Sequence, residues 1–408
     1  MLVRSLHTRD FRNLRDVDYR PHPRFNVIFG DNGQGKTNLL ESIFLLATQR
    51  SFRRSRLDDL VRFGTDKAEV VASICHAEVE RRLAIQILTR PSRKVTLCDG
   101  KSARSSDYFQ GVHVVLFAPE DLLLPKGSPE ERRRFLDRAI WNTCPGYLDE
   151  VRTYELLLKS RNAVLRSMLV SAGMRLPSRV TAAISDGEIA TEAASGDSET
   201  MLEVYSQQLA HAGARIIDRR RHYLRTIAPQ VEATFDRISR SGLCASLAYQ
   251  AKVSSRDVEA ASANELVGIL QEQFERDRRR DRMRGFTHSG PHGDDMQISL
   301  DGREAALHAS QGQIRALVLA LKITEIQHLF FLHGDPPVLL LDDVSSELDA
   351  QRNGYLFDFL RAMPSQVFIT TTSPEYVKLD QDRLDMRMAQ GGILAGSAHM
   401  VGSEIEPS

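Results

Sequence analysis

The stretch between residues 30 and 37 constrains the fold of this chain more than any other. It reads Gly-Asp-Asn-Gly-Gln-Gly-Lys-Thr and fits the pattern GxxxxGK[ST]. An apolar run of strand length, Phe25–Phe29, precedes it, and apolar residues at helical spacing follow it. Strand, glycine loop and helix N-terminus together form a phosphate site, whereas a glycine turn that binds nothing does not require this order. The predicted nucleotide contacts are Gly30, Asp31, Asn32, Gly33, Gln34, Gly35, Lys36 and Thr37, with Thr37 also expected to hold Mg²⁺.

Composition narrows the class of protein without identifying a partner. The chain has 408 residues, which is long for one domain, and its 54 basic residues equal its 54 acidic residues. Any argument for nucleic-acid binding must therefore be local. Its four cysteines form no CxxC pair, and no long apolar run is present, so we expect a cytoplasmic protein without a membrane span.

The order of sequence patterns predicts a head interrupted by a helical arm. Short alternating runs between residues 68 and 98 predict an antiparallel β lobe beside the nucleotide loop. From Ser128 the pattern becomes helical and arginine-rich, with one long helix expected to residue 168 and others over 200–240 and 264–284. We therefore predict a discontinuous head over 1–125 and 285–390 and an arm over 126–284. Residues 171–200 are expected to be a flexible insertion and 391–408 a disordered tail.

A second set of residues fits the other half of a nucleotide site. Asp342 ends the apolar run Val338–Leu341, where a phosphate-loop ATPase places the acid that positions Mg²⁺. Asp343 follows, where a general base for the attacking water would lie. Farther upstream, Ser310, Gln311, Gly312 and Gln313 open an apolar helix. They fit either a capping box, which requires no function, or an anion site at the helix N-terminus.

Several polar clusters allow two interpretations from the residues alone. Arg12 and Asn13 lie in a turn that either folds over a nucleotide or is an ordinary hairpin loop. Arginine clusters are either solvated surface or contacts to DNA phosphates. The candidates for DNA contact are Arg53, Arg54, Arg219, Arg220 and Arg221. The helix over 264–284 carries interleaved acids and arginines, which favours self-pairing over a duplex contact. The run from His288 to Asp295 is either a turn or a metal site, and its Gly-Pro favours the turn.

The order of these motifs resembles that of the ABC-type ATPases. Ser-x-Gly-Gln at Ser310, the apolar run ending in Asp342-Asp343, and Ser346-Glu347-Leu348-Asp349 resemble their signature, Walker B and D-loop motifs. The long helical insertion between Thr37 and Ser310 is similar to the SMC-like branch. Within that branch the chain resembles the RecF family of bacterial recombination mediators. The resemblance rests on Phe11-Arg12-Asn13, Asn32–Glu41, Phe117–Asp121, Gly127–Asp137, Gly290-Pro291-His292 and Leu340–Val344.

This resemblance implies both a fold and an activity. The fold class is α/β, an ABC-type, SMC-like P-loop ATPase head with a mixed sheet and an antiparallel β lobe, plus an inserted α-helical arm. The implied activity is a weak, DNA-stimulated ATPase with the cofactors ATP and Mg²⁺, in which Lys36 and Asp343 are catalytic. Two copies would dimerise on ATP, with Gly30–Thr37 of one facing Ser310–Gln313 of the other. The implied partners are duplex and gapped DNA, RecR, and through it RecO and RecA.

Two features depart from the family pattern, and other functions compete with this one. Gly293 replaces the arginine that usually follows Gly-Pro-His, and residues 171–200 are longer than the arm tip requires. The main alternative is an SMC-like ABC ATPase that serves another DNA process. A transporter subunit is disfavoured by the spacing of the signature, and a GTPase by the lack of an Asn-Lys-x-Asp motif.

Overall fold

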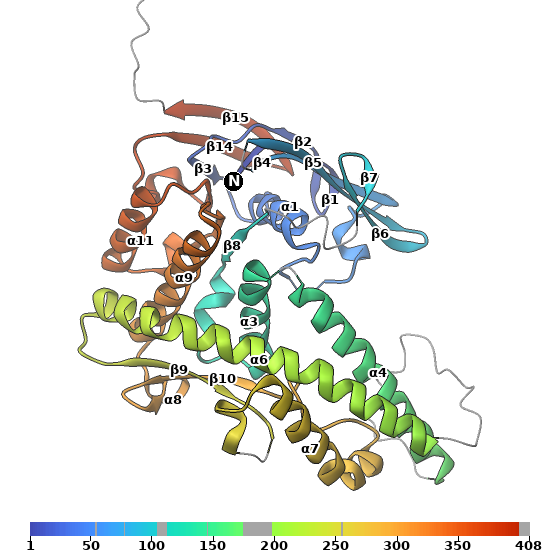
Figure 1. The fold of residues 1–408 in the computed structure, drawn as a ribbon. Coiled ribbons are helices and arrows are strands. Elements are labelled where there is room, and N and C mark those ends of the chain that lie inside the picture. The colour runs from blue at the N-terminus through green and yellow to red at the C-terminus, as the bar shows by residue number, and fades with distance from the viewer. Residues whose placement is uncertain are drawn as a thin grey trace, which may run out of the picture. The chain divides into compact units, whose positions relative to one another are not determined.

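The computed structural model divides into two compact units (Figure 1). It describes residues 1–53, 55–76, 78–103, 112–144, 146–173, 198–253 and 256–399. Unit 1 comprises Met1–Leu124, Val231–Gly242 and Ala309–Ser408, and unit 2 comprises Pro125–Gln230 and Leu243–His308. Residues 285–308 therefore group with unit 2, whereas the sequence analysis assigns them to the head.

A mixed six-stranded sheet forms the centre of unit 1, in the order β15-β14-β3-β13-β12-β8. Its strands are β3 (Phe25–Phe29), β8 (Val114–Phe117), β12 (Val338–Asp342), β13 (Val367–Thr371), β14 (Arg383–Ala389) and β15 (Gly392–His399). All neighbours pair in parallel except β14 and β15. Every residue of β12 and β13 is buried, as expected for parallel strands that are covered on both faces.

The prediction of a disordered tail is wrong for residues 392–399. They form β15, which pairs with β14 from Arg383↔His399 to Ala389↔Gly392. Gln390 and Gly391 both have positive φ, 50° and 75°, which is the backbone of a tight hairpin turn. The glycines read as a weakly patterned tail are therefore the turn of a hairpin, while residues 400–408 lie outside the described part of the chain.

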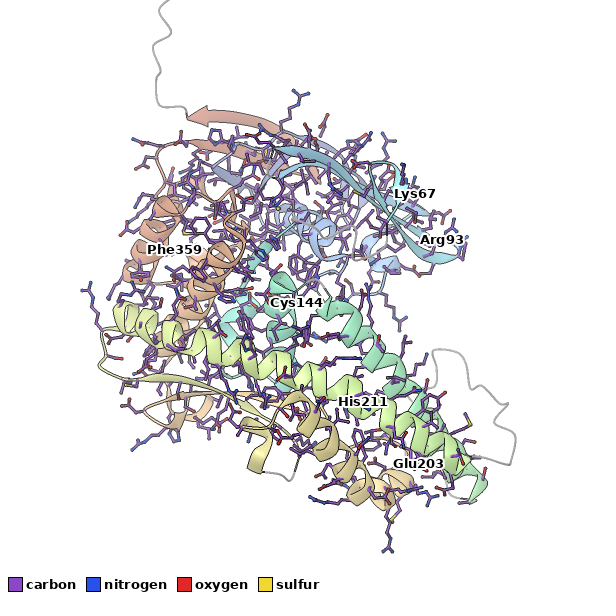
Figure 2. All side chains as sticks on the ribbon, viewed as in Figure 1. Lys67, Arg93, Cys144, Glu203, His211 and Phe359 are labelled. Atoms are coloured by element: carbon purple, nitrogen blue, oxygen red, sulfur yellow. The ribbon has the colours of Figure 1, made fainter. Side chains whose placement is uncertain are left out.

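A second six-stranded sheet of unit 1 confirms the predicted antiparallel β lobe. Its order is β2-β1-β4-β5-β6-β7. The strands are β1 (Leu2–Phe11), β2 (Leu14–Tyr19), β4 (Lys67–His76), β5 (Val79–Thr89), β6 (Ser92–Cys98) and β7 (Lys101–Ser102). The two strands that flank β5 place Lys67 and Arg93 on either side of Leu88 (Figure 2).

The helix that follows the glycine loop lies between the two sheets of unit 1. This helix, α1 (Lys36–Thr48), contacts β1 and β4 of one sheet and β12 and β13 of the other (Figure 1). The other helices of unit 1 are η1 (Asp58–Leu60), η2 (Pro119–Leu123), α9 (Gln311–His333), α10 (Val344–Glu347), α11 (Ala350–Ala362) and η4 (Pro374–Tyr376). Among the described helices, α9 alone is long and apolar enough to cross a bilayer, but 67% of its most apolar window is buried inside the protein, as in a core helix.

Unit 2 combines long helices with a small antiparallel sheet. Its helices are α3 (Pro129–Thr143), α4 (Tyr147–Ser171), most of α6 (Ser198–Ser239), η3 (Arg256–Glu259), α7 (Ala263–Arg284) and α8 (Ala305–His308). The sheet has the order β11-β10-β9, with β9 (Ala245–Gln250), β10 (Asp295–Leu300) and β11 (Arg303–Glu304). Glu203 and His211 mark the course of α6 in Figure 2.

The single helix expected over 128–168 is wrong, because the structure has two. Helix α3 ends at Thr143, Cys144 takes an extended conformation, and α4 begins at Tyr147. The intervening sequence contains Pro-Gly, which does not continue a helix. The start of α3 is as predicted, with Ser128 and Glu131 forming a capping box before Pro129. Most of the expected insertion, residues 174–197, lies outside the described residues.

Candidate nucleotide-binding site

The glycine loop joins β3 to α1 through positions that require glycine. Gly30, Gly33 and Gly35 have φ values of 145°, 80° and 108°, which side chains rarely adopt. A Cβ on Gly30 would lie 2.4 Å from the carbonyl oxygen of Met388, and one on Gly35 would lie 2.8 Å from Oδ1 of Asn13. The loop is therefore closely enclosed at both ends. At Gly33 nothing lies within 4 Å of such a Cβ, so the middle of the loop is open to a ligand.

Lys36 folds back into the loop that it follows. Its Nζ donates hydrogen bonds to the carbonyl oxygens of Gly30, at 2.6 Å, and Asp31, at 2.9 Å. Burial lowers the pKa of the ammonium, while the nearby carboxylates of Asp343 and Asp342 act in the opposite direction. The cation is therefore held in the concave side of the loop, where the pattern requires it.

Two hydroxyl groups converge on the carboxylate at the end of β12. Thr37 Oγ1 donates to Asp342 Oδ1 at 2.8 Å, and Thr370 Oγ1 donates to the same oxygen at 2.7 Å. Burial raises the pKa of Asp342, and the two hydrogen bonds lower it in part. The predicted meeting of Thr37 with Asp342 is present, although the two lie far apart in the chain.

Asp343 has a carboxylate oxygen that no group in the described part of the chain satisfies. It adopts left-handed backbone angles, φ 49° and ψ 27°, and its N–H donates to Thr370 Oγ1 at 3.0 Å. Its Oδ1 is buried without a hydrogen-bond partner in the protein, and burial raises the pKa of its carboxyl group. A buried unpaired carboxylate oxygen is costly unless a ligand or water satisfies it.

These donors fit Mg²⁺ in the way that phosphate-loop proteins bind it. Mg²⁺ prefers oxygen ligands, and protein sites supply one or two of them while phosphates and water supply the rest. Thr37 and Asp342 provide a hydroxyl and a carboxylate at one point. Among the described residues no group of three or more His, Cys, Asp or Glu side chains could form a complete metal site. The residues therefore fit a magnesium ion that is bound together with a nucleotide.

The turn at Arg12 and Asn13 lies beside the glycine loop, but its two side chains differ in role. Asn13 Nδ2 donates to the carbonyl oxygen of Gly33 at 3.0 Å, and Asn13 Oδ1 accepts from Asn38. Arg12 instead binds both carboxylate oxygens of the fully buried Glu41, at 3.0 and 2.8 Å. Asn13 thus reaches the loop directly, while the guanidinium of Arg12 is engaged with Glu41.

The β14–β15 turn is a second neighbour of the glycine loop, and the sequence analysis missed it. The N–H of Gln390 donates to Gln34 Oε1 at 2.6 Å, and the N–H of Gly391 donates to the Gln34 carbonyl oxygen at 3.1 Å. A Cβ on Gly391 would lie 2.0 Å from the carbonyl oxygen of Asn13. Gly391-Gly392 between two alternating runs was the signal that would have indicated a hairpin.

Arg53 also lies close to the loop, through α1. It donates to Asn38 Oδ1 at 2.7 Å and forms an ion pair with Glu41 at 3.6 Å. Its side chain remains 39% exposed, so DNA contact by Arg53 stays a prediction. Arg54 lies outside the described residues.

The stretch Ser310–Gln313 forms the capping box that its sequence predicts. Ser310 Oγ accepts from the Gln313 N–H at 3.2 Å, and Gln313 Oε1 accepts from the Ser310 N–H at 2.8 Å. Ser310 and Gln311 are exposed at the N-terminus of α9. A Cβ on Gly312 would lie 3.1 Å from Arg352, so little space remains behind the turn. The outer face of this turn is therefore open.

Two of the arginines predicted to contact DNA are buried in unit 2, so those predictions are wrong. Arg220 is 4% exposed and forms an ion pair with Asp137 at 2.9 Å. Arg221 is 5% exposed and donates to the carbonyl oxygen of Val258. The inward face of α6 uses these guanidinium groups to satisfy buried acceptors. Arg219 is half exposed and pairs with Glu150 at 3.4 Å.

The run from His288 to Asp295 forms a turn whose side chains bind separate partners. Asp295 binds Arg132, and His288 binds Asp281. Asp294 accepts from Tyr249 at 2.5 Å, and burial raises its pKa to about 6. His292 Nδ1 forms a hydrogen bond with the Tyr154 hydroxyl at 2.6 Å. The four side chains are therefore dispersed among structural contacts, as the turn interpretation predicts.

Comparisons with known proteins agree with the geometry. The profile of the RecF/RecN/SMC N terminal domain matches residues 2–395. The chain is 44% identical to the DNA replication and repair protein RecF of Anaeromyxobacter sp. (strain Fw109-5) over 93% of this chain and 94% of that protein. It is 42% identical to RecF of Myxococcus xanthus, over 93% of this chain and 92% of that protein.

Solved structures show the same fold. The structure of the recombination mediator protein RecF with ATP, from the RecFOR pathway, is 29% identical, has a TM-score of 0.82 and aligns over 97% of each chain. An SMC head domain from Pyrococcus furiosus matches in fold with 15% identity and a TM-score of 0.51, over 97% of this chain and 96% of that one. The ABC-type head predicted from the sequence is thus confirmed.

Proposed function

Because this chain belongs to the RecF family of SMC-like, ABC-type ATPases, we propose that it is an ATP-dependent recombination mediator that binds duplex DNA beside single-strand gaps. Its copies dimerise on ATP and hydrolyse it weakly, with stimulation by DNA. Through RecR and RecO they help to load RecA, in the cytoplasm. The observation that carries this proposal is the convergence of Thr37, Thr370 and Asp342, with Asp343 beside them.

The residues of the loop supply the binding step. The N–H groups of Gly33 to Thr37 and the N-terminus of α1 favour negative charge. Lys36 Nζ has two carbonyl partners, at 2.6 and 2.9 Å, and exchanges them for phosphate oxygens. Thr37 and Asp342 hold Mg²⁺, which when bound neutralises phosphate charge. Asn13 stabilises the conformation of the loop through its hydrogen bond to the Gly33 carbonyl oxygen.

Asp343 is the residue best placed to activate water. Its buried Oδ1 has no partner, and its raised pKa makes it a better proton acceptor than an ordinary aspartate. The N–H of Asp343 donates a hydrogen bond to Thr370 Oγ1 at 3.0 Å, and this bond holds the Asp343 backbone in place. A carboxylate that is short of a hydrogen bond is suited to accept a proton from water at this edge of the sheet.

Dimerisation follows from the open signature turn. Ser310 and the first N–H groups of α9 form an anion site that faces outward. We propose that this turn of one copy completes the phosphate site of the other. Neither copy then encloses the nucleotide alone, which links assembly to ATP.

Molecular mass in solution, with and without ATP, Mg²⁺ and duplex DNA, tests this proposal. The wild type is expected to become a dimer with ATP, and Asp343→Asn to remain one because hydrolysis is blocked. Lys36→Ala should neither bind ATP nor dimerise, and Ser310→Arg should bind ATP as a monomer. A wild type that stays monomeric at saturating ATP and retains DNA equally without nucleotide would refute the proposal. A dimer that ignores DNA would instead favour an SMC-like ATPase of another process.

A further inference from the structure

The acids of α7 pair with only some of its arginines, although the sequence interleaves the two. Asp277 accepts from Ser289 at 2.5 Å and from Gln273 at 2.9 Å. Asp281 is fully buried and forms an ion pair with Arg161 at 2.8 Å. Asp281 thus faces the interior of unit 2, whereas Asp277 is half-buried and its carboxylate also interacts electrostatically with Arg280. The self-paired surface helix favoured by the sequence is therefore confirmed in part: Arg276 and Arg278 pair with glutamates of α7, whereas Asp281 pairs with Arg161 instead.

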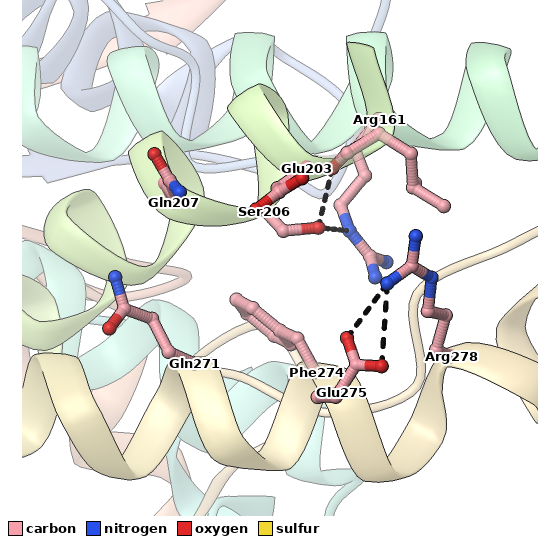
Figure 3. A pocket seen from close by; sticks show the side chains of 9 residues that line it. Arg161, Glu203, Ser206, Gln207, Gln271, Phe274, Glu275 and Arg278 are labelled. Carbon is pink, nitrogen blue, oxygen red and sulfur yellow. Dashed lines mark hydrogen bonds and ion pairs between the residues drawn. The ribbon is translucent and has the colours of Figure 1, made fainter. Parts of the chain in front are cut away.

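Several arginines of α7 form ion pairs with glutamates of α6 or α7. Arg278 pairs with Glu275 at 3.0 Å, beside a cavity of about 300 Å³ between α6 and α7 (Figure 3). Arg278 and Arg282 also pair with Glu199 at the start of α6. Three others, which we call the arginine stripe, are exposed and have no ion pair to a carboxylate in the part of the chain that the structure describes: Arg279, Arg280 and Arg284.

Helix stability alone does not explain the arginine stripe. Cations stabilise a helix C-terminus only within its last turn, and α7 ends at Arg284. Arg279 and Arg280 lie before that turn. Moreover, Arg280 and Arg284 are four residues apart, where like charges on a helix repel each other. The chain as a whole carries no net charge, so this local excess is not an effect of composition.

We propose that the arginine stripe binds the phosphate backbone of duplex DNA, an inference that rests on the proposed function. Guanidinium groups bind phosphate with two parallel hydrogen bonds. Arg280 and Arg284 are separated by about 6 Å along the helix, at about 1.5 Å per residue. One helical turn therefore separates the two guanidinium groups, so both can bind phosphates of the same strand. The contact reads no base sequence.

The test replaces the stripe and measures the salt dependence of DNA binding. In the variant Arg279→Gln/Arg280→Gln/Arg284→Gln, the side chains stay polar and helix-forming. The control is Arg134→Gln/Arg225→Gln/Arg276→Gln, which removes three exposed arginines of unit 2 that already pair with acids. Both variants change the net charge equally. Binding of a fluorescent duplex is followed by anisotropy with ATP and Mg²⁺ over a series of NaCl concentrations.

We expect the slope of log K against log salt to become shallower in the stripe variant, by about 0.9 for each phosphate that an arginine no longer neutralises and by up to about 2.7 for all three. The control should keep the wild-type slope. The triple Arg→Lys variant of the stripe should also keep most of the slope, which shows that charge rather than helix damage is responsible.

Three results would overturn the inference. An unchanged slope in the stripe variant refutes it while leaving the proposed function standing. If the stripe variant binds DNA normally but no longer binds poly-glutamate, the stripe is assigned to an acidic protein segment instead. A wild type that binds no duplex in the presence of ATP removes the proposed function, and the inference fails with it.

Discussion

Thr370 links both acids of the site, so its hydroxyl group is the most informative single group to remove. Thr370 Oγ1 donates to Asp342 at 2.7 Å and accepts from the N–H of Asp343 at 3.0 Å. Thr370→Val keeps the shape of the side chain and removes both bonds. The neighbouring Thr371 is a matched control, because it is also buried in β13 but donates only to the carbonyl oxygen of Ser373, at 3.0 Å.

The expected loss of stability follows from the two groups that the Thr370 hydroxyl binds. A hydrogen bond to a charged group contributes about 1.5–3 kcal/mol, and a buried N–H left unsatisfied costs about 1–3 kcal/mol. Thr370→Val should therefore lower the free energy of unfolding by about 2.5–6 kcal/mol. Thr371→Val removes one neutral hydrogen bond and should lower it by about 0.5–1.5 kcal/mol.

Urea unfolding followed by far-UV circular dichroism measures both variants. A second measurement uses the pKa of Asp342, which burial raises and the Thr370 hydrogen bond lowers. Without that bond the carboxyl group of the nucleotide-free protein protonates at a higher pH. As the pH is lowered, Thr370→Val should therefore lose Mg²⁺-dependent ATP binding at a higher pH than the wild type does. Equal losses of stability in the two variants, with unchanged pH profiles, would refute this reading of the site.

Two further predictions concern the contact of Gly391 with Asn13 and two titratable side chains of unit 2. Gly391→Ala should raise the KM for ATP at least tenfold, because its Cβ would meet the Asn13 carbonyl oxygen at 2.0 Å. The control is Gly64→Ala, where φ is also positive but no atom lies within 4 Å, and it should leave the KM unchanged. Equal KM values in the two variants would contradict a role for the β14–β15 turn in shaping the glycine loop. In unit 2, burial lowers the pKa of His292 from 6.5 to about 4 and raises that of Asp294 from 3.8 to about 6. Between pH 4 and 6.5 the lowered pKa of His292 makes the free energy of unfolding rise with pH, by about 3 kcal/mol in total. Between pH 3.8 and 6 the raised pKa of Asp294 makes it fall with pH, also by about 3 kcal/mol. Asp294→Asn should therefore show stability rising from pH 4 to 6.5 more steeply than the wild type in pH-dependent urea titrations. Parallel curves would contradict the raised pKa of Asp294.

Local patterns were sufficient to predict one half of the site. The glycine loop, Thr37 and Asp342 lie in short stretches whose type follows from period and residue identity. Their meeting follows because both β3 and β12 end at the same edge of a parallel sheet. The N-cap at Ser310 was likewise local, and it is present as predicted.

Non-local pairing decided the features that sequence reasoning missed. Thr370 is the first of three consecutive threonines, and only the register that pairs it with Asp342 selects it. Arg220 is buried because its partner Asp137, far away in the sequence, lies opposite α6. The periodicity of a helix places an arginine on the surface by default. It contains no information about an acid, distant in the sequence, that the fold places next to the arginine. The glycine pair Gly391-Gly392 is a local signal for a hairpin turn, and the prediction of a weakly patterned tail did not use it.

The backbone of Asp343 restricts which side chains evolution can place there. Left-handed angles are tolerated by glycine, asparagine and aspartate far better than by longer residues. A glutamate, whose side chain is longer by one methylene, would strain the turn at φ 49°. If Asp343 activates water as proposed, the main chain limits this position to a short acid, and a glutamate would require a different backbone turn.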